Sequence, residues 1–144
     1  MKIKQLHPEA ILPMYATSGA SAFDVFAYEP VEWQYNHFGW TAVIKTGLAF
    51  EIPQETGLFI LSRSGQGFNY NTHLSNCVGL LDFDFTGELR VKLLCFNSTP
   101  PPIVAELAIA QCVLLHTPRQ TFELVEELTK TERGSNAYGS TDKK

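Results

Sequence analysis

Residues 75–89 read SNCVGLLDFDFTGEL, and this stretch has the composition of β-structure. An apolar run leads into the alternating aspartates and phenylalanines of 82–85, and the turn pair Thr86-Gly87 follows. Successive side chains of a strand point to opposite faces, so a strand through 82–85 would place Asp82 and Asp84 on one face and the two phenylalanines on the other. The pattern predicts a β-hairpin.

Outward from this stretch, short apolar runs bounded by Gly, Pro, Asn or Asp recur, whereas helical periodicity is hard to find. This is typical of an all-β sandwich or barrel. The three prolines of 100–102 cannot donate to a ladder and break the chain between two strands, while 103–110 fit either a helical turn or a strand. The predicted strands are 3–6, 22–27, 42–44, 48–51, 57–61, 77–81, 88–96, 109–116 and 122–128.

The composition fits one packed domain. The chain has 144 residues, of which 44% are hydrophobic and 18% charged, which is enough apolar material for a core and too little charge for a disordered chain. No apolar run of about 18 residues or secretory signal is present, so we expect an intracellular, soluble, cytoplasmic protein, in the host cytoplasm if the source is viral, with no membrane partner. The net charge of −4 argues against binding a long nucleic acid.

The three cysteines, Cys77, Cys95 and Cys112, are odd in number and too far apart for a CxxC metal knuckle. We expect them to be reduced thiols packed as small hydrophobic side chains. The four histidines show no metal-ligand spacing.

The last fifteen residues differ from the rest. Residues 1–129 carry seven basic and thirteen acidic side chains (−6), and residues 130–144 carry four and two (+2). This segment, KTERGSNAYGSTDKK, has one large apolar side chain with which to anchor itself. We therefore expect a domain over 1–129 and a flexible C-terminal arm over 130–144, either frayed or serving as a strap whose tyrosine stacks on a base.

Two further stretches can carry chemistry. In SRSGQGF (62–68), hydroxyls, a guanidinium and glycines at the end of a strand can surround phosphate oxygens, although a solvated surface turn has the same composition. Near residue 82, a carboxylate beside an aromatic ring can orient and deprotonate a water. Ordinary turn chemistry and a weak Asp-x-Asp metal signal remain alternatives there.

In order and spacing, five stretches resemble the five motifs of the homotrimeric deoxyuridine triphosphate nucleotidohydrolases (dUTPases). They are YATSGASAFDVFA (15–27), SRSG (62–65), NCVGLLDFDFTG (76–87), AIAQ (108–111) and RGSNAYGST (133–141). The resemblance implies a distorted jelly-roll β-barrel and a homotrimer whose active sites are shared between subunits. It also implies Mg²⁺-dependent hydrolysis of dUTP to dUMP and pyrophosphate, which limits uracil incorporation into DNA and supplies dUMP for thymidylate synthesis.

The resemblance also implies roles for individual residues. Asp82 would be the base that activates the attacking water, and Asp24 would bind Mg²⁺ through water. Asn76, Phe85 and Tyr138 would contact uracil or deoxyribose. The remaining substrate-binding residues would be Arg63, Ser64, Gly65, Gly79, Gln111, Arg133, Gly139, Ser140 and Thr141.

The chain departs from the family pattern most in motif four, where Glu106, Leu107 and Ala108 replace the usual glycine, acid and arginine. Without the usual arginine–acid pair, the sequence leaves open which interactions hold this segment in place. Two other functions stay open: a dCTP deaminase of the same superfamily, and a catalytically weak nucleotide-binding regulatory module.

Overall fold

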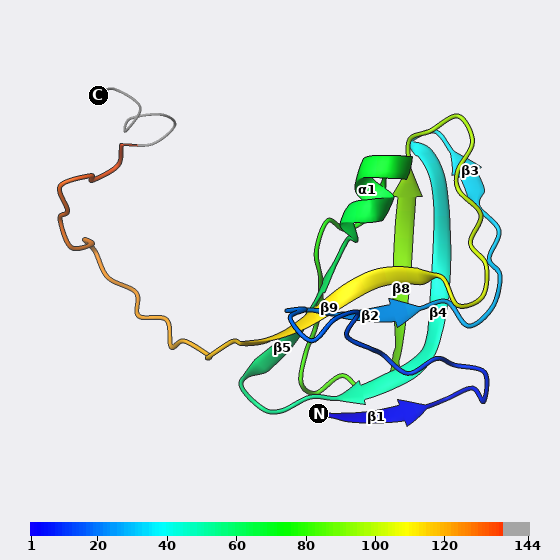
Figure 1. The fold of residues 1–144 in the computed structure, drawn as a ribbon. Helices are drawn as coiled ribbons and strands as arrows, with labels where there is room; N and C mark the ends of the chain where they lie inside the picture. Colours follow the sequence, from blue (N-terminus) through cyan, green and yellow to red (C-terminus); the bar gives the residue numbers. More distant parts are fainter. Residues whose placement is uncertain (137–144) are drawn as a thin grey trace.

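The computed structural model describes residues 1–136, whose strands form two antiparallel sheets (Figure 1). The first sheet has the order β1 (Lys2–Gln5), β4 (Gly39–Glu51), β8 (Glu88–Cys95) and β6 (Thr72–Leu74), with β3 (Gln34–Asn36) also paired to β4. The second has the order β2 (Phe23–Phe26), β9 (Ala108–His116), β5 (Thr56–Leu61) and β7 (Gly79–Leu81). One short helix, α1 (Ser64–Tyr70), follows β5.

The core lies between the sheets. Along β8 every second side chain is buried, as expected of a strand with one face toward a core. The side chains that lose all or nearly all contact with solvent come from both sheets and include Val25, Ile44, Leu58, Val91 and Ile109. This arrangement confirms the predicted all-β, jelly-roll fold.

Strand β4 corrects one sequence prediction, because 42–44 and 48–51 belong to a single strand of thirteen residues. The register with β8 shifts between Lys45 and Ala49, and Gly47 lies in this irregularity with φ +67°. A Cβ there would lie 2.6 Å from the Ala10 Cβ, so only glycine fits. The break that the sequence suggested between 44 and 48 is therefore a bulge within one continuous strand.

The predicted hairpin at 75–89 is wrong. β7 pairs with β5 in one sheet and β8 pairs with β4 and β6 in the other, so residues 82–87 cross between the sheets. The strand ends at Leu81, and Asp82 to Phe85 form a turn in which the Phe85 N–H donates to the Asp82 carbonyl at 3.1 Å. The alternation of aspartate and phenylalanine thus does not continue the strand.

The predicted strand at 122–128 is also wrong, because the single chain forms no strand there. The segment is extended but pairs with no strand within residues 1–136, and Figure 1 shows it running away from the two sheets. Phe122, Leu124 and Leu128 are 95%, 100% and 85% exposed. Residues 103–107, left open by the sequence, form a bridge from Ile103 to Val31 and then a turn that leads into β9.

Three short elements were not predicted from the sequence: β3, β6 and α1. Each has at most seven residues, too few for a hydrophobic period to show. β6 also depends on pairing with the distant strand β8, whereas β3 forms a tight hairpin with the start of β4. Within residues 1–136, no helix is long and apolar enough to span a membrane.

All three cysteines are free, as expected, and Cys95 and Cys112 are buried. The prediction that all three pack as small hydrophobic side chains is wrong for Cys77, which is exposed in the turn before β7 with φ 63°. Burial, with a smaller contribution from Asp24, raises the pKa of the Cys112 thiol to about 12.

The raised pKa of Cys112 predicts a stability change at high pH. Above the ordinary cysteine pKa of 9.0, the unfolded chain loses a thiol proton that the folded chain keeps up to about pH 12. Below pH 9 this contribution is fully present, and above it the free energy of unfolding falls by up to about 1.4 kcal/mol per pH unit. Urea unfolding on either side of pH 9 should show a smaller pH-dependent loss for Cys112→Ala than for the unmodified chain. Equal losses in both proteins would contradict the assignment.

Candidate active site

An ion pair joins β2 to the segment after β5. The Arg63 Nε and Nη2 atoms donate to the two oxygens of Asp24 at 3.0 and 3.2 Å, which is the fork geometry of a strong arginine–carboxylate pair. The side chains are 33% and 13% exposed, respectively. Arg63 also donates through Nη1 to the Ala108 carbonyl at 3.2 Å, so two of its five N–H groups have no acceptor in the described part of the chain.

Side-chain hydrogen bonds fix the neighbouring segments around this pair. Gln66 of α1 donates to the same Ala108 carbonyl at 2.9 Å, and Gln111 of β9 donates to the Ser62 carbonyl at 3.0 Å. Asp24 and Gln111 are directly paired in the β2–β9 ladder. The structure therefore brings together Asp24, Arg63 and Gln111, with Ser64 and Gly65 exposed at the first residues of α1.

The departures in motif four are supported by backbone hydrogen bonds. The Glu106 N–H donates to the Ala27 carbonyl at 2.9 Å, and the Ala27 N–H donates to the Leu107 carbonyl at 3.0 Å. Together with the two side chains that donate to Ala108, these bonds hold the segment against β2 and α1. The segment thus keeps its place without the usual arginine–acid pair.

Asn76 and Gly79 lie in a second region, on the far side of β5 from β9. They line a pocket of about 260 Å³ together with Ile60 of β5 and Arg90 and Lys92 of β8. Asn76 is exposed in the turn before β7, and its carbonyl accepts from the Val78 N–H at 2.7 Å. An amide side chain and strand-edge backbone groups in one recess can recognise the edge of a planar heterocycle.

Asp82 lines a larger pocket of about 540 Å³, whose wall also includes Asp84, Phe83, Thr56 and Arg119. Asp82 is exposed and stands at the end of β7, where it is free to contact a water. In the same crossing segment, Phe85 is 46% exposed and its ring lies over Gly87, where a Cβ would come within 2.6 Å of the ring. A carboxylate and a half-exposed aromatic ring therefore stand close together in the chain.

Asp82 and Gln111 lie toward opposite ends of β5, whereas Gly79 pairs with Ile60, near the Gln111 end. Leu81 pairs with Leu58, which places Asp82 near Gly57, whereas Leu61 pairs with Gln111. At about 3.3 Å per residue, Gly57 and Leu61 are about 13 Å apart, and Ser64 lies beyond Leu61. A single chain therefore keeps Asp82 apart from Ser64 and Gln111.

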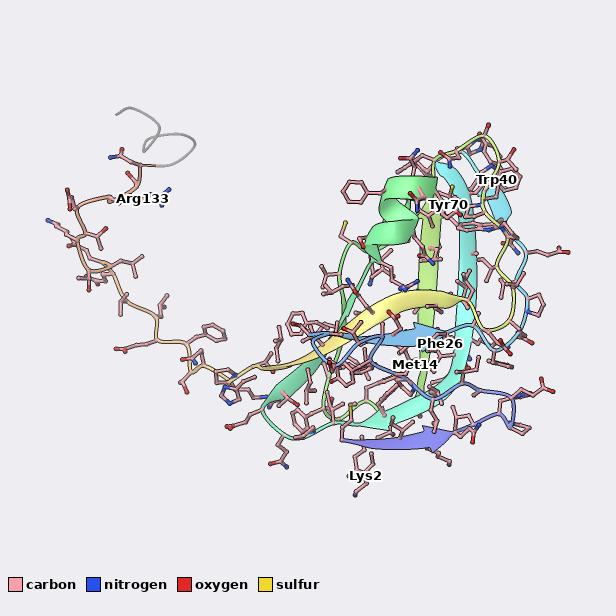
Figure 2. All side chains as sticks on the ribbon, in the orientation of Figure 1. Lys2, Met14, Phe26, Trp40, Tyr70 and Arg133 are labelled. Carbon is pink, nitrogen blue, oxygen red and sulfur yellow. The ribbon has the colours of Figure 1, made fainter. Side chains whose placement is uncertain are left out.

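Arg133 is separate from both groups. It lies on the extended C-terminal segment, away from the two sheets in Figure 2, and its Nε donates locally to the Asn136 carbonyl at 3.0 Å. The predicted site residues Tyr138, Gly139, Ser140 and Thr141 lie outside the described residues.

The Asp24 carboxylate has acceptor capacity left for contact with a metal ion through water. Each Asp24 oxygen accepts one hydrogen bond from Arg63, and a carboxylate oxygen has a second lone pair that can accept from a metal-bound water. Among residues 1–136, no three His, Cys, Asp or Glu side chains are grouped to hold a metal ion directly. The Asp24 carboxylate can still accept a hydrogen bond from a water bound to Mg²⁺.

Sequence reasoning missed two residues of these regions. Gln66 is buried and ties α1 to β9, and Arg119 reaches the pocket that Asp82 lines. The glutamine of SRSGQGF was a visible signal in the sequence. Arg119 stands in a stretch with no recognisable pattern, so only the fold reveals it.

Removing the Asp24 carboxylate tests the ion pair. Asp24→Ala leaves a largely buried guanidinium without its anionic partner, so we expect the free energy of unfolding to fall by about 1–3 kcal/mol, as measured by urea denaturation. The matched control is Lys2→Ala, which breaks the exposed Lys2–Glu51 pair at 2.7 Å and should leave stability unchanged. Similar losses of unfolding free energy in both variants would show that the Asp24–Arg63 pair stabilises the fold no more than an exposed ion pair.

Comparisons with known proteins agree with this fold. The dUTPase family model matches residues 8–142. The deoxyuridine 5'-triphosphate nucleotidohydrolase of Nautilia profundicola is 38% identical over 143 residues, which cover 99% of each chain. A solved structure of a variant dUTPase from phage 80alpha aligns with a TM-score of 0.81 at 23% identity, covering 96% of each chain. A variant dUTPase of the Staphylococcus aureus phage phi11, solved with attention to a structural Mg(II) ion, aligns with a TM-score of 0.74 at 20% identity, covering 90% of this chain and 98% of that one. Because the family match and the sequence identity extend over nearly the whole length, and the fold is shared, this chain belongs to the dUTPase family.

Proposed function

We propose that the chain hydrolyses dUTP to dUMP and pyrophosphate, which limits uracil incorporation into DNA and supplies dUMP for thymidylate synthesis. The observation that carries the proposal is the family match over residues 8–142, which includes every motif discussed above. We expect the reaction to take place in the cytoplasm.

In this proposal Asp82 is the general base. It orients one water toward the α-phosphorus of dUTP and accepts a proton as the new O–P bond forms. The bond from the α-phosphorus to the bridging oxygen then breaks, and pyrophosphate leaves with the bond's electron pair. The exposed position of Asp82 in a pocket of about 540 Å³ supports this role, since both water and substrate have room there.

The nucleoside would bind on the β7 side of the molecule. Asn76 and the backbone around Gly79 would hydrogen-bond the uracil edge, and Phe85 would stack on the deoxyribose. A base with the opposite donor and acceptor at that edge leaves buried polar groups unpaired, which costs about 1–3 kcal/mol for each group. This cost would discriminate against cytosine.

The phosphates would bind at the end of β5 where Leu61 pairs with Gln111. The Ser64 hydroxyl, the Gly65 backbone, Gln111 and the two unused N–H groups of Arg63 are the donors on the protein side. Arg133, Gly139, Ser140 and Thr141 would approach from the C-terminal arm, where Tyr138 would cover the uracil ring. Asp24 would hold Mg²⁺ through water; when bound, the ion would neutralise charge that develops on the phosphate oxygens.

A homotrimer with shared active sites would reconcile this chemistry with the distances in one chain. Asp82 and Gln111 lie at opposite ends of β5, so one subunit would supply the base and its neighbour the phosphate donors. The extended segment supports assembly as well, because Phe122, Leu124 and Leu128 are almost fully exposed. Burying each of them on a neighbour would contribute about 1.5–3 kcal/mol.

Mixed trimers test whether the sites are shared. Asp82→Asn and Gln111→Ala chains, each impaired alone, are unfolded together, refolded as a mixture and assayed with dUTP. Activity should return, because some sites then combine an intact Asp82 with an intact Gln111 from different subunits. A mixture no more active than the sum of its separate components would contradict the shared site, and light scattering would establish the subunit number.

Substrate specificity tests the activity itself. Pyrophosphate release from dUTP in the presence of Mg²⁺ should be much faster than release from dCTP or dTTP. Equal rates would refute the substrate assignment, and ammonia release from dCTP would point to a deaminase. Tight dUTP binding with negligible product, unaffected by Asp82→Asn, would identify a regulatory module instead.

A further inference from the structure

We infer that Arg119 is a positioning residue for the reaction, because its guanidinium packs on Phe83 and thereby holds the turn that carries Asp82. The inference rests on the proposed function, in which Asp82 is the general base. Neither Arg119 nor Phe83 belongs to the residues assigned above to substrate or metal.

The contact is a cation–π interaction. The Arg119 Cζ atom lies 5.4 Å from the centroid of the Phe83 ring, within the range over which a guanidinium is attracted to an aromatic face. Among the described residues, no ion pair joins Arg119 to a carboxylate. The ring is therefore the partner that the structure shows for this cation, although Asp82 and Asp84 line the same pocket.

Phe83 is held from two sides. It is partly buried and packs against the hydrophobic core, while Arg119 covers its ring. Phe83 is the residue between Asp82 and Asp84, and the turn is closed by the hydrogen bond from the Phe85 N–H to the Asp82 carbonyl. A side chain fixed on both sides restricts the backbone of this turn, and with it the direction of the Asp82 carboxylate.

The backbone near Arg119 is held in place by a hydrogen bond. The nearby Thr117 N–H donates to the Glu55 carbonyl at 2.7 Å, directly before β5, and Thr117 lines the same pocket. This bond places the end of β9 beside the Asp82 turn, and the extended C-terminal segment begins there. Arg119 thus connects the first residues of that segment to the catalytic turn.

The test compares Arg119→Ala, Arg119→Lys, Phe83→Leu and the double variant Arg119→Ala/Phe83→Leu. Arg119→Ala should lower kcat for dUTP about three- to tenfold with KM unchanged, because a small displacement of a catalytic group costs rate rather than binding. Arg119→Lys keeps a cation over the ring and should recover most of the activity. The double variant should be no worse than the poorer single variant, since both remove the same contact. Lys45→Ala removes an exposed cation on β4 that lines none of these pockets; it is the matched control and should match the unmodified chain.

A second measurement does not depend on turnover. Hydrogen exchange of the peptide that contains residues 82–87 should be faster in Arg119→Ala than in Lys45→Ala, with an unchanged thermal midpoint. Unchanged exchange, additive losses in the double variant, or a raised KM with unchanged kcat would each overturn the inference. If the unmodified chain fails to hydrolyse dUTP while Arg119→Ala still loosens the turn, the proposed function fails and the structural part of the inference stands.

Discussion

Asp82→Asn is expected to lower kcat for dUTP by about a hundredfold to ten-thousandfold, the range that a positioned general base contributes. The amide has nearly the same shape as the carboxylate but cannot accept the proton of the attacking water. Substrate binding should persist, because the donors for the phosphates and uracil are elsewhere. Pyrophosphate release gives kcat, and calorimetry with a non-hydrolysable dUTP analogue gives the affinity.

Asp84→Asn is the matched control for this prediction. Asp84 lines the same pocket, lies two residues away and loses the same charge in the substitution. We expect it to retain kcat within about tenfold, since only one carboxylate orients the water. A larger loss in Asp84→Asn than in Asp82→Asn would reverse the assignment of the base.

Deletion of residues 131–144 should give a folded trimer whose kcat/KM for dUTP is lower by about a hundredfold or more. The deletion removes Arg133 and four other proposed contacts to the nucleotide, and each charge-assisted hydrogen bond contributes about 1.5–3 kcal/mol. The thermal midpoint should not change, because the hydrogen bonds of residues 131–136 are all local, such as that from Arg133 to Asn136.

Two controls separate binding from folding. Arg133→Ala alone should reproduce part of the loss with the remaining arm intact. Deleted chains mixed with Asp82→Asn chains should recover activity if the arm and the base come from different subunits. Loss of the trimer or of cooperative unfolding in the deletion variant would show instead that the segment is structural.

Prediction from sequence succeeded where one local pattern sufficed. The alternating residues of 88–96 and the apolar run of 109–116 mark strands that the structure contains almost as predicted. The same reasoning failed at 82–85 and at 122–128, where similar alternation occurs in a turn and in an unpaired extension. Alternation reports a preference for extended backbone, whereas a strand also requires a partner.

For this protein, the order and spacing of its five motifs alone indicated the family, because the agreement with the family pattern extends in one order from residue 15 to residue 141. The sequence also determined the all-β class, since its short apolar runs can be buried only between sheets. Only the tertiary structure decided that Asp24 pairs with Arg63, that β7 and β8 lie in different sheets, and that Arg119 meets Phe83. Each of these contacts joins segments far apart in the chain, and their selection depends on the combined packing of the whole core rather than on any local pattern.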